Sequence, residues 1–221
     1  MVRFRTLIPF LLFLCLVLFH APNACSENEG PLTEQIRNTV EKVLAILENS
    51  SKNGDPNKAK SDEEKKQLTE AESAYRTDLR KIIFPQFDFP EMAKRSLGLN
   101  WRPRTETEQQ EFVALFTDLL EDFLSGKLKS FEDEKFVYMR EVKDGNYAKV
   151  DTKIVTKEGE EITINYILHQ VDEDWKVYDM EIENVSLVKN YRSQFNRIIA
   201  NSSYQELVRR IKRVTKNGPG H

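Results

Sequence analysis

The chain has 221 residues, with 33 Lys and Arg side chains against 36 Asp and Glu, and a formal net charge of −3 at pH 7. This balance gives no support for a nucleic-acid-binding protein, which would be expected to carry a basic domain or patch. Both cysteines, Cys15 and Cys25, precede residue 27. Disulfides, thiol nucleophiles and cysteine metal sites are therefore not expected in the rest of the chain.

Residues 1–26 have the order of a secretory signal peptide. A positive start is followed by an apolar run at Leu7–Phe19 and by small residues at Ala21–Ser26. The run is well short of the ~20 residues that a membrane-spanning helix needs. Its removal would leave a single domain over 27–221. The alternative is a lipoprotein that begins at Cys25, which is disfavoured because a proline stands where a lipid-attachment motif has an aliphatic residue.

Helical periodicity dominates the first half of the chain that follows. Caps are predicted at Ser61 and Asp88, and a charged insert interrupts the pattern at residues 49–66. A long helix that starts at Thr105 or Thr107 carries a broad apolar stripe rich in phenylalanine, as is typical of a helix covered on more than one side. The other expected helices are Leu32–Leu47, Ser61–Ile83, Asp88–Leu97, Leu187–Ala200 and Tyr204–Val214.

From Lys135 the apolar period changes to two, which predicts strands. Short turns with Gly, Asn and Asp between them favour antiparallel hairpins. In the last strand Trp175 and Val177 should share one face, and Tyr178, Met180 and Ile182 the other. The expected strands are Lys135–Val142, Tyr147–Thr156, Glu161–Val171 and Trp175–Asn184. Helices followed by such a meander predict an α+β fold, a cone of curved four-stranded sheet wrapped by helices around an apolar cavity.

Few residues suggest catalysis. Asp179, Glu181 and Glu183 alternate along one strand, and we expect an outward polar row. The alternative is a cone-fold isomerase or dehydratase that uses Asp179 as its acid or base. His169 has no nucleophile paired with it in the sequence and is expected to be structural or solvated. No group of residues has metal-ligand spacing, so no metal or other cofactor is expected.

Two separated segments carry a family resemblance. FDFPEMAKRSLGLNW at Phe87–Trp101 and WKVYDMEIENVSLVKNYRSQF at Trp175–Phe195 resemble the hallmark motifs of the MlaC (toluene-tolerance Ttg2) family of periplasmic phospholipid carriers. The resemblance extends over Leu79–Arg213. It implies a nuclear-transport-factor-like cone that holds the acyl chains of a phospholipid as cargo, without a catalytic role. A related branch of the family accompanies hopanoid biosynthesis, so a hopanoid or another hydrophobic cargo is the alternative.

The same resemblance implies a location and partners. The protein is expected in the periplasm, as a monomer that moves lipid between an outer-membrane lipoprotein–porin complex and an inner-membrane ABC transporter with a periplasmic lipid-binding subunit. This transport would maintain the lipid asymmetry of the outer membrane. The residues expected to line the lipid cavity are Leu115, Leu119, Phe123, Val150, Ile154, Tyr166, Leu168, Tyr178, Met180 and Val188.

Overall fold

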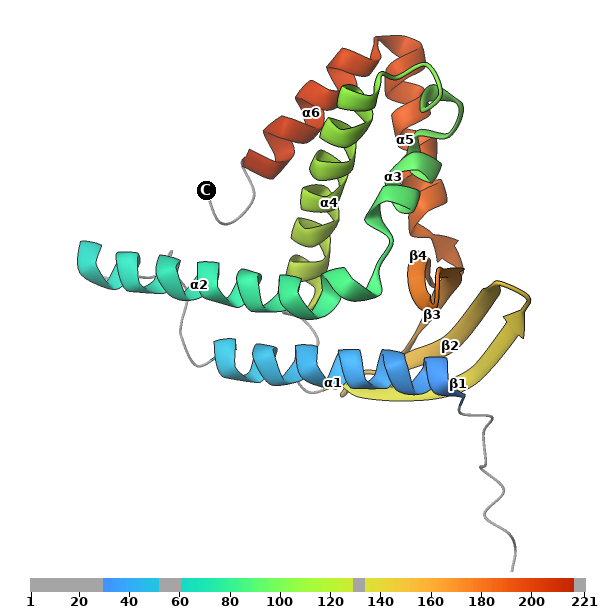
Figure 1. Ribbon diagram of the computed structural model, residues 1–221. Helices are drawn as coiled ribbons and strands as arrows, with labels where there is room; N and C mark the ends of the chain where they lie inside the picture. The colour runs from blue at the N-terminus through green and yellow to red at the C-terminus, as the bar shows by residue number, and fades with distance from the viewer. Residues whose placement is uncertain (1–29, 52–60, 129–133, 217–221) are drawn as a thin grey trace, which may run out of the picture.

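The computed structural model describes residues 30–51, 61–128 and 134–216 (Figure 1). The predicted signal peptide, Cys25 and the middle of the charged insert lie outside the described residues. Within these residues, the structure has no helix that combines the length and the apolar character needed to cross a membrane.

Six α-helices are found in the described part of the chain, and local caps explain several of their ends. The Asp88 side chain accepts a hydrogen bond from the Glu91 N–H at 2.9 Å and starts α3, which ends where Gly98 adopts a φ of +55°. Thr105 and Glu108 cap each other's N–H groups and start α4. The helices are α1 (Pro31–Ser51), α2 (Asp62–Ile83), α3 (Phe89–Leu97), α4 (Glu106–Leu128), α5 (Leu187–Asn201) and α6 (Tyr204–Lys216). Short 3-10 turns, η2 (Phe84–Gln86) and η3 (Gly98–Asn100), flank α3.

The strands form one antiparallel meander in the order β1-β2-β3-β4-β5. Their bounds are β1 (Lys135–Asp144), β2 (Tyr147–Val155), β3 (Glu161–Val171), β4 (Asp174–Ile182) and β5 (Val185–Ser186). The predicted last strand ends earlier than expected, because Glu183 and Asn184 have φ values of +50° and +61° in a turn that adds the short β5. The α+β prediction is confirmed, with one strand more than the sequence indicated.

A bulge in β4 corrects the predicted faces of that strand. Ile167 of β3 pairs with Asp179 and the next residue of β3 pairs with Val177, so Tyr178 is the extra residue. Val177 and Met180 therefore pack in the same apolar cluster, whereas Tyr178 packs with the helical residues. The alternation expected from the sequence fails at this one position.

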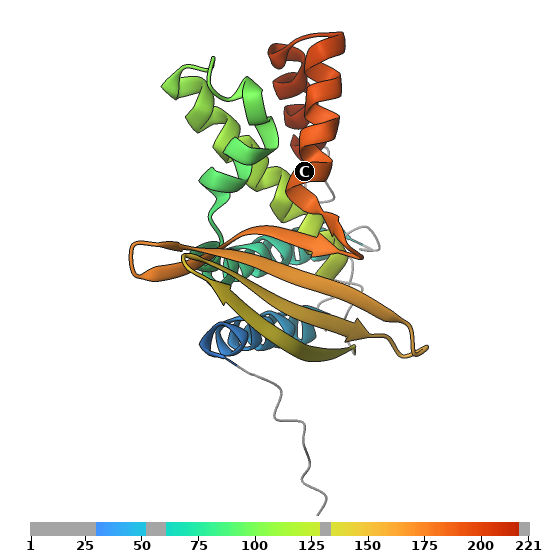
Figure 2. The same cartoon turned by 90° about the vertical axis from the view of Figure 1, so that its right-hand side faces the viewer.

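The helices occupy two places around the sheet. Figure 1 shows α1 and α2 running side by side, and Figure 2 shows α3, α4, α5 and α6 rising as a group beyond the β4 edge of the sheet. One apolar core lies inside that helical group, a second lies between the sheet and α1, and a third joins α1 to α2. The long α4 belongs to the helical group, so α1 is the helix that covers the apolar face of the sheet.

Candidate functional site

An apolar cavity of about 110 Å³ lies between the sheet and α1. The ends of α2 and α4 and the turn η2 complete its wall. Thr39, Gln86 and the hydroxyl of Tyr166 are its polar groups, and no charged side chain is found among the described residues that line it. The lining residues are Ile36, Thr39, Val40, Val43, Leu44, Ile83, Gln86, Phe87, Phe123, Leu124, Phe136, Ile154, Ile164, Tyr166, Met180 and Ile182.

Simple periodicities build this wall. On α1 the apolar residues Ile36, Val40 and Val43 recur at helical spacing and face the sheet. On β3 the alternate residues Ile164 and Tyr166 point to the same side, as the period of two requires. An apolar helix stripe and an apolar strand face therefore enclose a space with an apolar surface.

The helix α1 is fixed at its start by a carboxylate from β1. An oxygen of Glu141 accepts hydrogen bonds from the N–H groups of Leu32 and Thr33, at 3.0 and 2.8 Å. A negative charge at a helix N-terminus is favourable, because the unpaired N–H groups carry partial positive charge. This contact fixes the position of α1 over the sheet.

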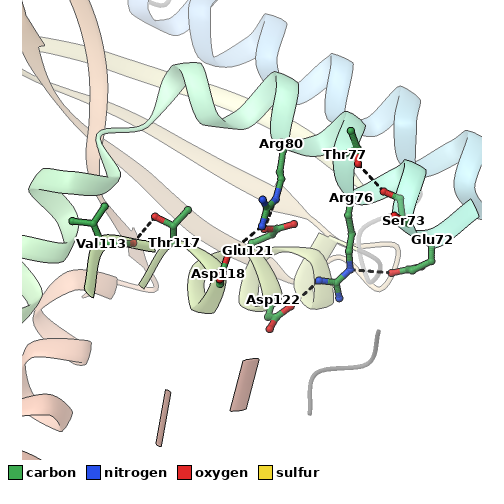
Figure 3. Close-up of polar contacts among 10 residues, drawn as sticks. All are labelled: Glu72, Ser73, Arg76, Thr77, Arg80, Val113, Thr117, Asp118, Glu121 and Asp122. Atoms are coloured by element: carbon green, nitrogen blue, oxygen red, sulfur yellow. Dashed lines mark hydrogen bonds and ion pairs between the residues drawn. The ribbon is translucent and has the colours of Figure 1, made fainter. Parts of the chain in front are cut away.

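The C-terminal end of α1 is held in place through its neighbour α2. Figure 3 shows two arginines of α2 directed at acidic residues of α4. Arg76 lies 2.8 Å from Asp122, and Arg80 donates from Nε to Glu121 at 2.7 Å and from Nη2 to Asp118 at 3.1 Å. These ion pairs tie the α1–α2 pair to the helical group across the cavity end.

The structure brings four of the ten predicted lipid-binding residues to this cavity: Phe123, Ile154, Tyr166 and Met180. Val150 and Leu168 belong to the core between sheet and α1, but they are fully buried and do not line the cavity. The other four pack with the helical group because α4 belongs to it and because the bulge turns Tyr178 away. These four are Leu115, Leu119, Tyr178 and Val188.

Most of the wall contributed by α1 is absent from the predicted set. Ile36, Val40, Val43 and Leu44 line the cavity. The available signal was the one-sided apolar stripe of the first predicted helix, which shows that this helix covers something. Nothing in the stripe itself says that the covered surface is the sheet.

Asp179 is buried, at 8% exposure, so the expectation that it belongs to an outward polar row is wrong. One of its oxygens accepts from the N–H groups of Met180 and Val188 at 2.8 and 3.0 Å. The other accepts from the hydroxyl of Ser186, which itself caps α5. The carboxylate thus joins β4 to the start of α5, and it is not among the residues that line the cavity.

His169 has a structural partner. Its Nε2 lies 2.9 Å from a carboxylate oxygen of Asp88, and its ring packs against Tyr178 with centroids 4.9 Å apart. In the segments that the structure describes, no group of three or more His, Cys, Asp or Glu side chains could hold a metal ion. The arrangement suits the binding of an apolar molecule better than acid–base chemistry.

Comparisons with known proteins show the family and the fold. The family model of the MlaC protein matches residues 57–213. The toluene tolerance protein ttg2D of Pseudomonas putida is 24% identical over 133 residues, which cover 59% of this chain and 62% of the relative, so the match spans less than two thirds of that relative. A phospholipid-binding protein from Ralstonia solanacearum, solved in complex with a phospholipid, has the same fold, with a TM-score of 0.67 and 22% identity over 83% of this chain and 96% of that chain. This chain belongs to the MlaC family.

Proposed function

We propose that the protein is a periplasmic carrier that binds a phospholipid with its acyl chains in the cavity between α1 and the sheet. The observation that carries this proposal is the lining of the cavity, which is apolar apart from Thr39, Gln86 and the Tyr166 hydroxyl. Each methylene group moved from water into such a space contributes ~0.8 kcal/mol. The phospholipid bound by the Ralstonia solanacearum protein of the same fold supports this cargo.

Membership of the family supports the proposed transport. The carrier would act as a monomer between an outer-membrane lipoprotein–porin complex and an inner-membrane ABC transporter with a periplasmic lipid-binding subunit, and would help to maintain outer-membrane lipid asymmetry. A carrier has to hide acyl chains from water, while a charged headgroup can remain solvated. No cationic cluster inside the cavity is needed for this task.

A carrier is preferred to an enzyme on the same fold because of Asp179. Its carboxylate oxygens accept hydrogen bonds from Ser186, Met180 and Val188, so the residue has a complete structural role at the corner between β4 and α5. A general acid or base would need to reach a substrate in the cavity. A hopanoid or another hydrophobic cargo is distinguished from a phospholipid by the extraction described next.

The first test is native mass spectrometry of the protein purified from periplasm, followed by organic extraction. A bound phospholipid is expected, and its mass identifies the headgroup and the chains. A protein that carries no lipid and takes none up from phospholipid vesicles would contradict the proposal. A bound hopanoid would replace the proposed cargo class by the alternative.

A matched pair of variants on α1 tests the location of the lipid. Val40 and Ile46 are both half-buried β-branched residues of this helix, but Val40 lines the cavity and Ile46 does not. Val40→Phe should lower the bound lipid by reducing the space for the chains, and Ile46→Phe should leave it unchanged. Circular dichroism checks that both variants fold. Equal lipid content in the two variants would show that the chains lie elsewhere.

From the residues predicted by sequence, we propose Phe123, Ile154, Tyr166 and Met180 as contacts of the acyl chains. Each lines the cavity, and they come from α4, β2, β3 and β4. Chains held by residues from several elements would be shielded on all sides, as aqueous transport requires.

A further inference from the structure

The hydroxyl of Tyr166 is a polar group in an otherwise apolar place. Tyr166 is 8% exposed and lines the cavity from the middle of β3. Its hydroxyl makes no hydrogen bond within the part of the chain that the structure describes, and it keeps some accessible surface, as a group that meets a ligand must. Buried hydroxyls are nearly always hydrogen-bonded, because an unpaired one loses its bonds to water without replacement. A partner supplied by the cargo would remove this cost.

The other polar groups of the wall differ in this respect. The hydroxyl of Thr39 donates to the carbonyl oxygen of Gln35 at 2.8 Å. The side-chain oxygen of Gln86 accepts from the amide of Gln35, also at 2.8 Å. Among the described lining residues, the amide nitrogen of Gln86 is a second donor without a hydrogen bond, but Gln86 is only half-buried, so its amide has access to water. Tyr166 is the buried lining residue with a donor free for a ligand.

These polar groups lie toward one end of the cavity. The register of β3 and β4 pairs Tyr166 with Met180, and a parallel bridge joins Phe87 to Val177 on the same stretch of β4. The bridge places Gln86, the neighbour of Phe87 in the chain, near that stretch. The pair Ile164 and Ile182 lies further along the strands, where the wall is apolar. The cavity thus has a polar end and an apolar end, as a lipid has.

We propose that the Tyr166 hydroxyl donates a hydrogen bond to a carbonyl oxygen of the cargo and thereby selects lipids whose chains are linked by esters. This inference rests on the proposed function and names the linkage that the carrier recognises. An ester carbonyl stands at the head of an acyl chain, where a lipid changes from polar to apolar. That position matches the polar end of the cavity.

The protonation state of the residue suits this role. Burial raises the pKa of Tyr166 above its ordinary value, so the hydroxyl keeps its proton and remains a donor throughout the neutral range. An ether-linked chain of the same length fills the same apolar space but lacks the carbonyl oxygen. The donor therefore distinguishes two lipids that hydrophobic contact alone would bind equally.

The test is a competition between two phosphatidylcholines with identical chain lengths, one with ester and one with ether linkages, offered to the purified full chain. Native mass spectrometry gives the ratio of the two complexes. The wild-type protein should prefer the diester by roughly three- to tenfold, the range expected for one net hydrogen bond. Tyr166→Phe keeps the ring and should bring the ratio close to one.

Tyr138→Phe is the matched control. Tyr138 belongs to the same apolar cluster as Tyr166 and is similarly buried, but it does not line the cavity. Its variant should keep the wild-type ratio. A wild-type ratio near one, or a preference retained by Tyr166→Phe, would overturn the inference while leaving the carrier function intact. Failure of the wild-type protein to bind either lipid would overturn the proposed function, and this inference with it.

Urea unfolding of the lipid-free protein provides a second readout. Removal of an unpaired buried hydroxyl should leave the midpoint for Tyr166→Phe unchanged or raise it. A clear decrease would show that the hydroxyl has a partner within the fold, and would overturn the inference.

Discussion

Replacement of Asp179 by alanine tests the corner where the sheet meets the helical group. The carboxylate accepts from the N–H groups of Met180 and Val188 and from the hydroxyl of Ser186. The same hydroxyl accepts from the N–H of Lys189 at 3.0 Å and caps α5. Alanine would leave three donors without their acceptor in a place that is almost inaccessible to water.

The magnitude follows from these contacts. Each buried donor left unpaired costs about 1–3 kcal/mol, and water entering the gap recovers part of it. We therefore expect Asp179→Ala to lower the free energy of unfolding by about 3 kcal/mol. Ser186→Ala removes the cap of α5 but leaves the two N–H bonds of the carboxylate, so its cost should be about 1 kcal/mol.

Urea unfolding at pH 7, followed by circular dichroism, measures both variants against the wild type, with the slope m checked for constancy. Lipid content per folded molecule should stay normal in Asp179→Ala, since Asp179 does not line the cavity. The reasoning is refuted if Asp179→Ala is within 1 kcal/mol of the wild type. An undiminished stability together with a loss of ligand turnover would instead favour the enzyme alternative.

The ion pairs between α2 and α4 should respond asymmetrically to mutation. Arg80→Met leaves Glu121, whose side chain is 9% exposed, without its ion-pair partner and should lower the free energy of unfolding by about 2 kcal/mol. Glu121→Gln leaves the half-exposed Arg80 paired with Asp118 and should lower it by at most about 1 kcal/mol. Urea unfolding measures both variants, and the opposite order of the two losses would contradict this prediction. Phe116→Ala, in the core of the helical group, should cost about 3–5 kcal/mol, and a loss below 2 kcal/mol by the same method would contradict the packing. Burial raises the pKa of Tyr204 from 10.0 to about 12. The folded state thus favours the neutral phenol, so the free energy of unfolding should be unaffected below pH 10 and should decrease between pH 10 and 12. This decrease should be smaller in Tyr204→Phe, which has no phenol at this position. An equal decrease with pH in both proteins would contradict the prediction.

Local signals in the sequence were sufficient for the elements themselves. Asp88 and Thr105 start helices through side-chain bonds to N–H groups three residues ahead, and the amino acid types alone indicate this. Gly98 ends α3 in a conformation that favours glycine. The strands follow from the alternation that begins at Lys135, because the apolar residues of β2 and β3 gather on one face. The sequence does not indicate that Asp151 and Asn165, on the opposite face, are buried as well.

Pairing between distant elements could not be predicted in the same way. Both α1 and α4 carry apolar stripes, and that of α4 is the broader and is rich in phenylalanine. In the structure Phe112 and Phe116 pack on Phe195 of α5, so the stripe is used inside the helical group. An apolar stripe indicates that one face of a helix is buried, but it does not indicate which element covers that face. The stripe alone therefore does not decide whether Leu115 and Leu119 face the sheet or the helical group, with which they pack in the structure.

The bulge at Tyr178 explains why the predicted faces of β4 were wrong, and it lies where the two motifs meet. By turning Tyr178 and Asp179 to the side of the helical group, it leaves Val177 and Met180 together on the face that packs against α1. The first motif meets β4 at the same place, because the N–H of Asp88 donates to the carbonyl oxygen of Val177 at 2.9 Å. Residues of the two motifs therefore build the junction between sheet and helices. Since few of them touch the cavity, a chain can keep both motifs and still differ in its cargo, which is why the lining residues have to be tested directly.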